Sequence, residues 1–183
     1  MPILSEKGYL IPAVNNNTVD YVDCARLLAT SIKSFHPTAK ICLLTNQMVE
    51  DNTFDYVKVL PYGDQSQGQE WKLQNDWQCF AASPFRQTIK LEADMLATSP
   101  IDHWWTLFEH KDLVISQGCR DFYGQVSKSR YYRKIFDTNE LPDVYNAITY
   151  WRVSKLAKEF FDLVRAIFTD WDSFKKLLKK VFC

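Results

Sequence analysis

The sequence predicts an α/β domain in which a mostly parallel central sheet is flanked by helices. Short apolar runs alternate along the chain with segments whose apolar residues recur every three or four positions. Polar side chains follow several of the expected strands, as they do at the ligand-binding edge of open parallel sheets. The 183 residues (1–183) are expected to form one such domain.

The first part of the chain alternates strand and helix. The apolar run Gly8–Val14 suits a strand, and the segment that Thr18 would cap and Pro37 would close suits an amphipathic helix. Two further strands are expected at 40–46 and 55–63. The predicted buried face of the helix consists of Tyr21, Cys24, Ala25, Leu28, Ile32 and Phe35.

The middle of the chain begins with a polar loop at 64–71, which we expect on the surface and long enough to move. A helix is expected at 70–83, and within it KLQND (Lys72–Asp76) is interpreted as a solvated face rather than a donor contact. After a strand that includes Thr88, a helix should begin near Pro100. Its Trp104–Trp105 pair is expected to pack beneath the sheet. A catalytic pair of Asp102 and His103 is not favoured, because adjacent positions on a helix do not face each other.

The last part begins with a strand at 112–118 and a charged excursion at 127–143. In that excursion, RYYRK (Arg130–Lys134) is more typical of a surface segment than of nucleic-acid binding. A strand at 144–153 precedes a long helix from Ser154. The final stretch, 172–183, is lysine-rich and amphipathic. We expect its apolar face to pack on the domain, with a membrane or partner contact as the alternative.

Composition and charge exclude several classes of protein. A hydrophobic fraction of 46% and a charged fraction of 24% are those of a folded globular chain. Basic and acidic residues balance at 22 each, so the charge does not indicate a nucleic-acid surface. No apolar run approaches the ~20 residues that span a bilayer, and no secretory signal is recognised.

The cysteines are typical of reduced, mostly buried thiols rather than of a zinc site or disulfides. They are scattered, odd in number and never spaced as a CxxC pair. Together with the absence of a recognised signal, they predict a cytoplasmic location. They are Cys24, Cys42, Cys79, Cys119 and Cys183.

The stretch TIKLEADMLATSP (Thr88–Pro100) holds the strongest candidate site. Glu92 and Asp94, separated by one residue, stand where an apolar strand should end. Side chains two residues apart on a strand point to the same face, so the two carboxylates would repel each other, and burial would add to that cost. A hard divalent cation would relieve both penalties and could clamp a diphosphate. The alternative is an ordinary solvated turn.

Two further stretches accompany this acid pair. NNNTVDY (Asn15–Tyr21) follows the first strand, and VYNAITYWRV (144–153) lies beyond the acid pair. With RQTIKLEAD (Arg86–Asp94), their order resembles a GT-A glycosyltransferase of the glycogenin and lipopolysaccharide galactosyltransferase type, which includes shorter phage-encoded members. The resemblance runs from Gly8 to Trp171 as an order of motifs rather than a close identity.

The resemblance implies a Rossmann-like nucleotide-diphospho-sugar transferase fold and transfer of a sugar to an acceptor hydroxyl. A UDP-sugar donor is favoured, assisted by Mn²⁺ or Mg²⁺. It implies that Asp94 binds the metal directly with help from Glu92, and that Arg86 or Lys90 neutralises the diphosphate charge. The implied nucleotide-sugar contacts are Ala13, Asn15 and Tyr21 for base and ribose, and Asn146 and Ala147 for the sugar.

Three departures from this type stand out. Glu92 replaces the usual Asp, and Ile148 replaces the glycine expected after Asn146 and Ala147. The third metal ligand of the type, a histidine near its C-terminus, has no counterpart, because the last histidine is His110. The chain is therefore expected to be a minimal version without the usual metal-ligand segment, a weak metal binder, or a fold kept without activity.

Two other functions remain as alternatives. One is a catalytically degenerate module that binds a nucleotide sugar or a partner, which the missing histidine favours. The other, less expected, is a nucleotidyltransferase, which normally has a glycine-rich, basic phosphate loop after its first strand. PAVNNNT (Pro12–Thr18) contains neither glycine nor lysine.

Overall fold

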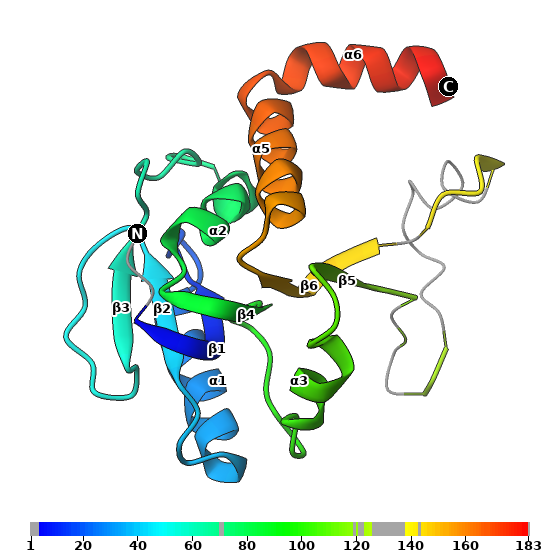
Figure 1. Cartoon of the computed structure of the whole chain (residues 1–183). Helices are drawn as coiled ribbons and strands as arrows, with labels where there is room; N and C mark the ends of the chain where they lie inside the picture. Colours follow the sequence, from blue (N-terminus) through cyan, green and yellow to red (C-terminus); the bar gives the residue numbers. More distant parts are fainter. Residues whose placement is uncertain are drawn as a thin grey trace.

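A six-stranded sheet forms the centre of the molecule (Figure 1). Its strands are β1 (Ser5–Pro12), β2 (Ile41–Thr45), β3 (Tyr56–Val59), β4 (Phe85–Leu91), β5 (Leu113–Gln117) and β6 (Val144–Arg152). They lie in the order β3-β2-β1-β4-β6-β5. The pairs β3–β2, β2–β1 and β1–β4 are parallel, whereas β6 is antiparallel to both β4 and β5. The predicted mostly parallel α/β sheet is confirmed.

The computed structural model describes residues 4–69, 72–118, 120, 123–125, 138–142 and 144–182. RYYRK (Arg130–Lys134), Cys119 and Cys183 lie outside the described residues. Within the described part, no helix is both long enough and apolar enough to cross a bilayer.

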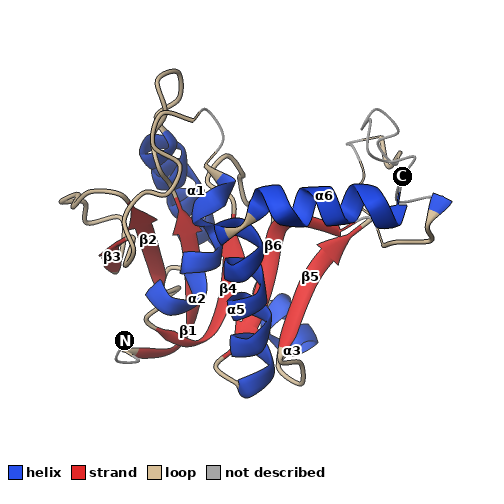
Figure 2. Cartoon of the chain, turned by 90° about the horizontal axis from the view of Figure 1, so that it is seen from above, coloured by secondary structure: helices blue, strands red, loops and turns tan. Residues whose placement is uncertain are grey.

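Helices cover both faces of the sheet (Figure 2). They are α1 (Tyr21–Phe35), the 3₁₀ helix η1 (Leu73–Gln78), α2 (Cys79–Ala82), α3 (His103–Phe108), α5 (Lys155–Thr169) and α6 (Trp171–Phe182). Because strand side chains alternate, each strand contributes to two cores, one under α1 and α3 and one under α2 and α5. The two faces of the C-terminal end of β4 therefore have different surroundings.

The core under α1 and α3 is aromatic. Trp104 and Trp105 pack against it, as predicted, and the Trp105 Nε1–H donates to Tyr9 Oη at 3.1 Å. On the opposite face, Trp151 of β6 and Phe161 of α5 pack edge to face at 5.0 Å between ring centroids. These contacts fix α3 and α5 against opposite sides of the sheet.

The N-cap of helix α1 lies two residues after the predicted one. Asp20 is the N-cap, and its side chain accepts from the Asp23 N–H at 3.0 Å. Thr18 lies in the preceding turn, where the Asn16 side chain accepts from its N–H at 2.9 Å. The helix buries Val22, Ala25, Leu28, Ala29 and Ile32, close to the face predicted from periodicity.

The segment predicted as a helix at 70–83 is instead the 3₁₀ helix η1 followed by the single turn α2. The described part of the loop before it, 64–69, is hydrogen-bonded to η1. Ser66, Asn75 and Gln78 are buried, and Asn75 Nδ2 donates to Asp64 Oδ1 and to Ser66 Oγ at 2.8 Å each. Amide side chains pack inward here because the irregular loop backbone needs their hydrogen bonds.

Arg165 of α5 closes the outside of this segment. Its guanidinium lies over the rings of Tyr62 and Trp77, at 4.9 and 5.1 Å from their centroids. Stacking of a guanidinium on aromatic faces ties the loop, η1 and α5 together.

The long helix expected from Ser154 ends at Thr169, and α6 follows as a separate helix. The predicted packing of α6 on the domain is wrong, because its described side chains are exposed except for a partly buried Phe174. Cys42 and Cys79 are buried and free, as predicted, and Cys24 is free but only partly buried. Burial raises the pKa of Cys42 to about 12, so its thiol stays protonated at neutral pH.

Gly8 is required where β1 passes the ring of Phe85. A Cβ at this position would lie 2.4 Å from the Phe85 ring and 2.7 Å from the Lys40 carbonyl oxygen. We expect Gly8→Ala to lower the free energy of unfolding by about 1–3 kcal/mol, the usual cost of overpacking. Urea unfolding measures this, with Ser5→Ala on the same strand as the control. Equal midpoints for Gly8→Ala and the wild type would contradict the close approach.

Candidate functional site

The acid pair lies directly after β4, at the edge of the sheet formed by the carboxyl ends of the parallel strands. The Glu92 N–H donates to the Ala147 carbonyl oxygen at 3.1 Å, which fixes the backbone here to β6. Ala93 is buried, whereas the Glu92 side chain is partly buried and Asp94 is exposed. The backbone that carries Glu92 is therefore fixed at the rim of the domain, with Asp94 two residues further along.

A buried ion pair lies beneath these acids. Lys90 is only 2% exposed, and its Nζ donates to Asp76 Oδ2 at 2.9 Å. Burial alone would lower the pKa of the Lys90 ammonium, but the Asp76 charge outweighs it, so the pKa is raised and the lysine stays charged. Asp76 belongs to η1, so the pair joins η1 to β4. The interpretation of KLQND as a solvated face is wrong, because Asp76 is bound here and Lys72 donates to the Ser66 carbonyl.

The same pair holds Asn146. Lys90 Nζ also donates to the Asn146 carbonyl oxygen at 2.9 Å, and Asn146 Nδ2 donates to Asp76 Oδ2 at 2.5 Å. Thr149 Oγ1 donates to Asn146 Oδ1 at 2.8 Å. Both ends of the Asn146 amide are thus fixed, and the residue remains exposed at the rim. We call Asp76, Lys90, Asn146 and Thr149 the polar ring.

Negative charge accumulates around Glu92. Its pKa is raised, first by burial and then by the neighbouring carboxylates of Asp76 and Asp94, and the Lys90 ammonium only partly offsets this. Asp76 thus adds a third carboxylate to the two that the sequence pattern indicated. Its contribution was not predicted because it comes from a segment interpreted as a helix surface.

The residues expected to receive the nucleotide lie at the ends of β1 and α1. Ala13 is buried, with its N–H donating to the Leu44 carbonyl oxygen at 2.7 Å. Asn15 is partly buried, and its Oδ1 accepts from the Val22 N–H at 3.0 Å, so it shapes the turn into α1. Tyr21 is partly buried at the start of α1. β1 pairs with β4, so this turn and the acid pair share one edge of the sheet.

Arg86 does not join this group. It lies near the start of β4 and donates to Glu6 Oε2 at 3.2 Å. Leu91 lies five positions further along the strand, about 16 Å away at ~3.3 Å per residue. The predicted diphosphate contact of Arg86 is therefore not supported by its position, whereas Lys90 lies within the site.

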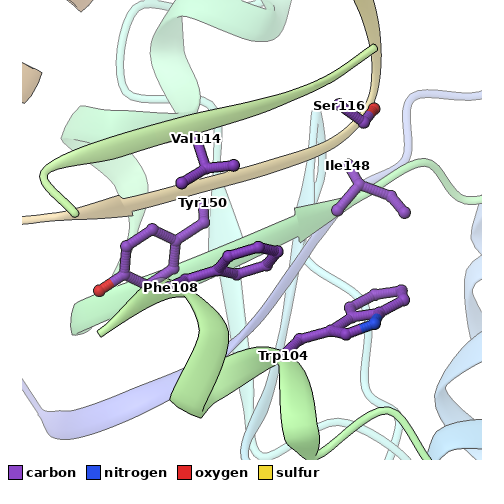
Figure 3. A pocket seen from close by; sticks show the side chains of 6 residues that line it. All are labelled: Trp104, Phe108, Val114, Ser116, Ile148 and Tyr150. Carbon is purple, nitrogen blue, oxygen red and sulfur yellow. The ribbon is translucent and has the colours of Figure 1, made fainter. Parts of the chain in front are cut away.

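An apolar cavity of about 260 Å³ lies on the other face of the sheet, between α3, β5 and β6 (Figure 3). Ile148 lines it, together with aromatic side chains of α3 and β6. Ile148 stands where the resemblance expects glycine, and its side chain points into this cavity, away from Lys90 and Asp76. The extra side chain therefore does not fill the polar ring. The cavity is lined by Trp104, Phe108, Val114, Ser116, Ile148 and Tyr150.

The donor atoms at the acid pair suit a hard divalent cation. Carboxylate oxygens are the ligands that Mg²⁺ and Mn²⁺ prefer. The pKa of Glu92 is raised first by burial and then by the carboxylates of Asp76 and Asp94, and a bound cation would offset both effects. Within the described residues, however, no cluster of three or more Asp, Glu, His or Cys side chains is placed to hold a metal. A cation here would rely on Glu92 and Asp94, with diphosphate oxygens and water as its other ligands.

Comparison with known proteins bears on the fold. No protein-family model and no curated protein matches the chain. A crystal structure of the galactosyltransferase LgtC with donor and acceptor sugar analogues matches with a TM-score of 0.62 at 11% identity, covering 90% of this chain and 64% of that one. An active-site mutant of LgtC matches with a TM-score of 0.59 at 12% identity, covering 82% and 59%. The chain thus spans less than two thirds of either structure. The sheet and its flanking helices have the GT-A fold that the resemblance implied.

The raised Glu92 pKa predicts a pH-dependent cost to stability. The folded protein holds this proton more tightly than the unfolded chain, so ionisation of Glu92 destabilises the fold at neutral pH but not below the ordinary carboxyl pKa. We expect Glu92→Gln to raise the Tm at pH 7 by on the order of 1–2 °C, with the gap closing towards pH 4. Thermal unfolding across this pH range, with exposed Glu109→Gln as control, measures it. A Tm difference between variant and wild type that widened at low pH would contradict a raised pKa of Glu92.

The polar ring predicts energetic coupling between Asp76 and Lys90. Asp76→Asn leaves a buried, unpaired ammonium and should cost about 3–5 kcal/mol of stability. Lys90→Met should also destabilise, but the double variant should lose less than the sum of the two, because it buries no unpaired charge. Urea unfolding of all four proteins gives the coupling energy. Additive losses would show that the two side chains do not interact.

Proposed function

We propose that this chain is a metal-dependent glycosyltransferase that transfers a sugar from a nucleotide-diphosphate sugar, with UDP-sugars favoured, to an acceptor hydroxyl. Two observations support the proposal together. The chain has the GT-A fold, and at the end of β4 the acid pair lies beside an immobilised asparagine on β6. The juxtaposition of Glu92, Asp94 and Asn146 carries the proposal. Kinship to glycogenin and to the short phage-encoded transferases stays a prediction.

The residues divide into three roles. The turn of Ala13, Asn15 and Tyr21 would receive the base and ribose, since it opens at the same edge as the acid pair. Asn146 would orient the donor sugar. Among the described residues, its hydrogen bonds to Asp76 and Thr149 use one amide hydrogen and one Oδ1 lone pair, so the second of each can meet sugar hydroxyls. Ala147 would fix the acid pair through its carbonyl oxygen.

Glu92 and Asp94 would hold Mn²⁺ or Mg²⁺ against the diphosphate. When bound, such an ion neutralises the charge that develops on the leaving diphosphate. Lys90 lies beneath this place but is committed to Asp76 and Asn146, so its part is to hold the ring rather than to contact phosphate directly.

A non-catalytic module that binds a nucleotide sugar is the second candidate. One observation favours it: the described residues offer two carboxylates at the rim rather than a cluster of three metal ligands. Such a module would bind the nucleotide without turning over the donor.

The proposal predicts metal-dependent nucleotide binding that requires Asp94. UDP with Mn²⁺ should raise the Tm more than either alone, because the cation would lie between the acid pair and the diphosphate. A ligand at 100 times its Kd stabilises the folded protein by about 2.7 kcal/mol. Asp94→Ala should lose the metal-dependent part of the shift, while exposed Glu109→Ala keeps it. Nucleotide release from UDP-, GDP- and CMP-sugars with Mn²⁺ then identifies the donor.

The outcomes separate the candidates. Metal-dependent binding with release from one donor supports the transferase. Binding that survives Asp94→Ala, with no release from any donor, supports the module. The absence of any metal-dependent nucleotide binding would overturn the transferase proposal.

A further inference from the structure

Helix α6 is the least covered helix of the described chain. Leu177 and Val181 are 53% and 62% exposed, and Trp171 is 45% exposed. Among the other elements α5 is the main one that it contacts, and Figure 1 shows α6 running outward from the end of α5 rather than along the sheet. Apolar side chains in this number are normally covered, so their exposure needs an explanation.

The exposed side chains of α6 form two faces, one apolar and one basic. At roughly 100° per residue, the apolar side chains fall on one side of the helix and the lysines on the other. Asp172 is the only acid in α6, so the helix carries a clear excess of positive charge. The apolar face comprises Trp171, Phe174, Leu177, Leu178 and Val181, and the basic face comprises Lys175, Lys176, Lys179 and Lys180.

The lysines of α6 differ from those of α5. Lys155 and Lys158 in α5 pair with Glu159 and Asp162 one turn later. Within the described residues, none of the four α6 lysines has a carboxylate partner at salt-bridge distance. Their charge is therefore available to an external anionic partner.

We propose that α6 binds the surface of a bilayer that contains acidic lipids. A helix with an apolar face of Trp, Phe and Leu and a lysine-rich polar face lies in the plane of the interface, its apolar side chains below the headgroups and its lysines among the phosphates. A tryptophan at one end suits the headgroup level. The four lysines of α6 lie within its 12 residues, and charged side chains in that number are not found in the hydrocarbon core, so α6 would lie on the membrane rather than cross it.

A second copy of this chain fits the same face less well. Pairing two α6 helices through their apolar sides would bring two positively charged helices together, with no acid across the interface to compensate. Acidic lipids supply both an apolar layer and the opposite charge. The inference does not depend on the proposed transferase activity.

Co-sedimentation of the full chain with lipid vesicles tests this. We expect the protein to partition at least tenfold more strongly onto phosphatidylcholine vesicles with about a third phosphatidylserine than onto pure phosphatidylcholine, and added salt should weaken the binding. Replacing the four α6 lysines by glutamine, or Leu177 and Leu178 by glutamine, should each reduce partitioning at least tenfold. Lys155→Gln with Lys158→Gln is the matched control, expected to change partitioning less than twofold.

All variants should keep the wild-type circular dichroism and thermal unfolding, because the substituted side chains are exposed. Equal partitioning onto neutral and acidic vesicles, no partitioning, or loss of binding in the α5 control would each overturn the proposal. Concentration-dependent self-association that Leu177→Gln with Leu178→Gln abolishes, without vesicle binding, would assign the face to a second copy instead.

Discussion

The candidate site depends on one buried ion pair. Lys90 points from β4 into the space beneath η1, where an ammonium without a partner would be costly. Asp76 provides that partner, and the main-chain carbonyl of Asn146 accepts a second hydrogen bond. One lysine therefore joins a parallel strand, an antiparallel strand and a 3₁₀ helix that are distant in sequence.

This joint determines what stands at the rim. The Asn146 amide is oriented because Asp76 accepts from one end of it and Thr149 donates to the other. The backbone of Glu92 is positioned by its hydrogen bond to β6. Both halves of the candidate site thus take their positions from the β4–β6 pairing. The antiparallel strand is as important to the site as the parallel strands that define the fold class.

The sequence predicted the parts of the molecule that local patterns control. Strand and helix alternation, the amphipathic face of α1 and the acid pair at a strand end are all short-range signals, and they identified the fold class and the end of β4. The polar ring could not be found this way, because Asp76 and Asn146 are 70 residues apart and meet only through the sheet order. Arg86 shows the converse error. It is close to the acid pair in sequence, but an extended strand carries it to the other end of the sheet. For α6, periodicity identified the two faces but could not show whether a neighbour covers the apolar one.

The contacts between the loop at 62–66 and η1 hold η1 in one position. The buried side-chain amides of Asn75 and Gln78 accept hydrogen bonds from the loop's backbone N–H groups. The Arg165 guanidinium covers the ring of Tyr62. The carboxylate of Asp76 is thereby held in place before any ligand arrives. The entropy of ordering this segment is lost when the chain folds, so it need not be lost again at each binding event.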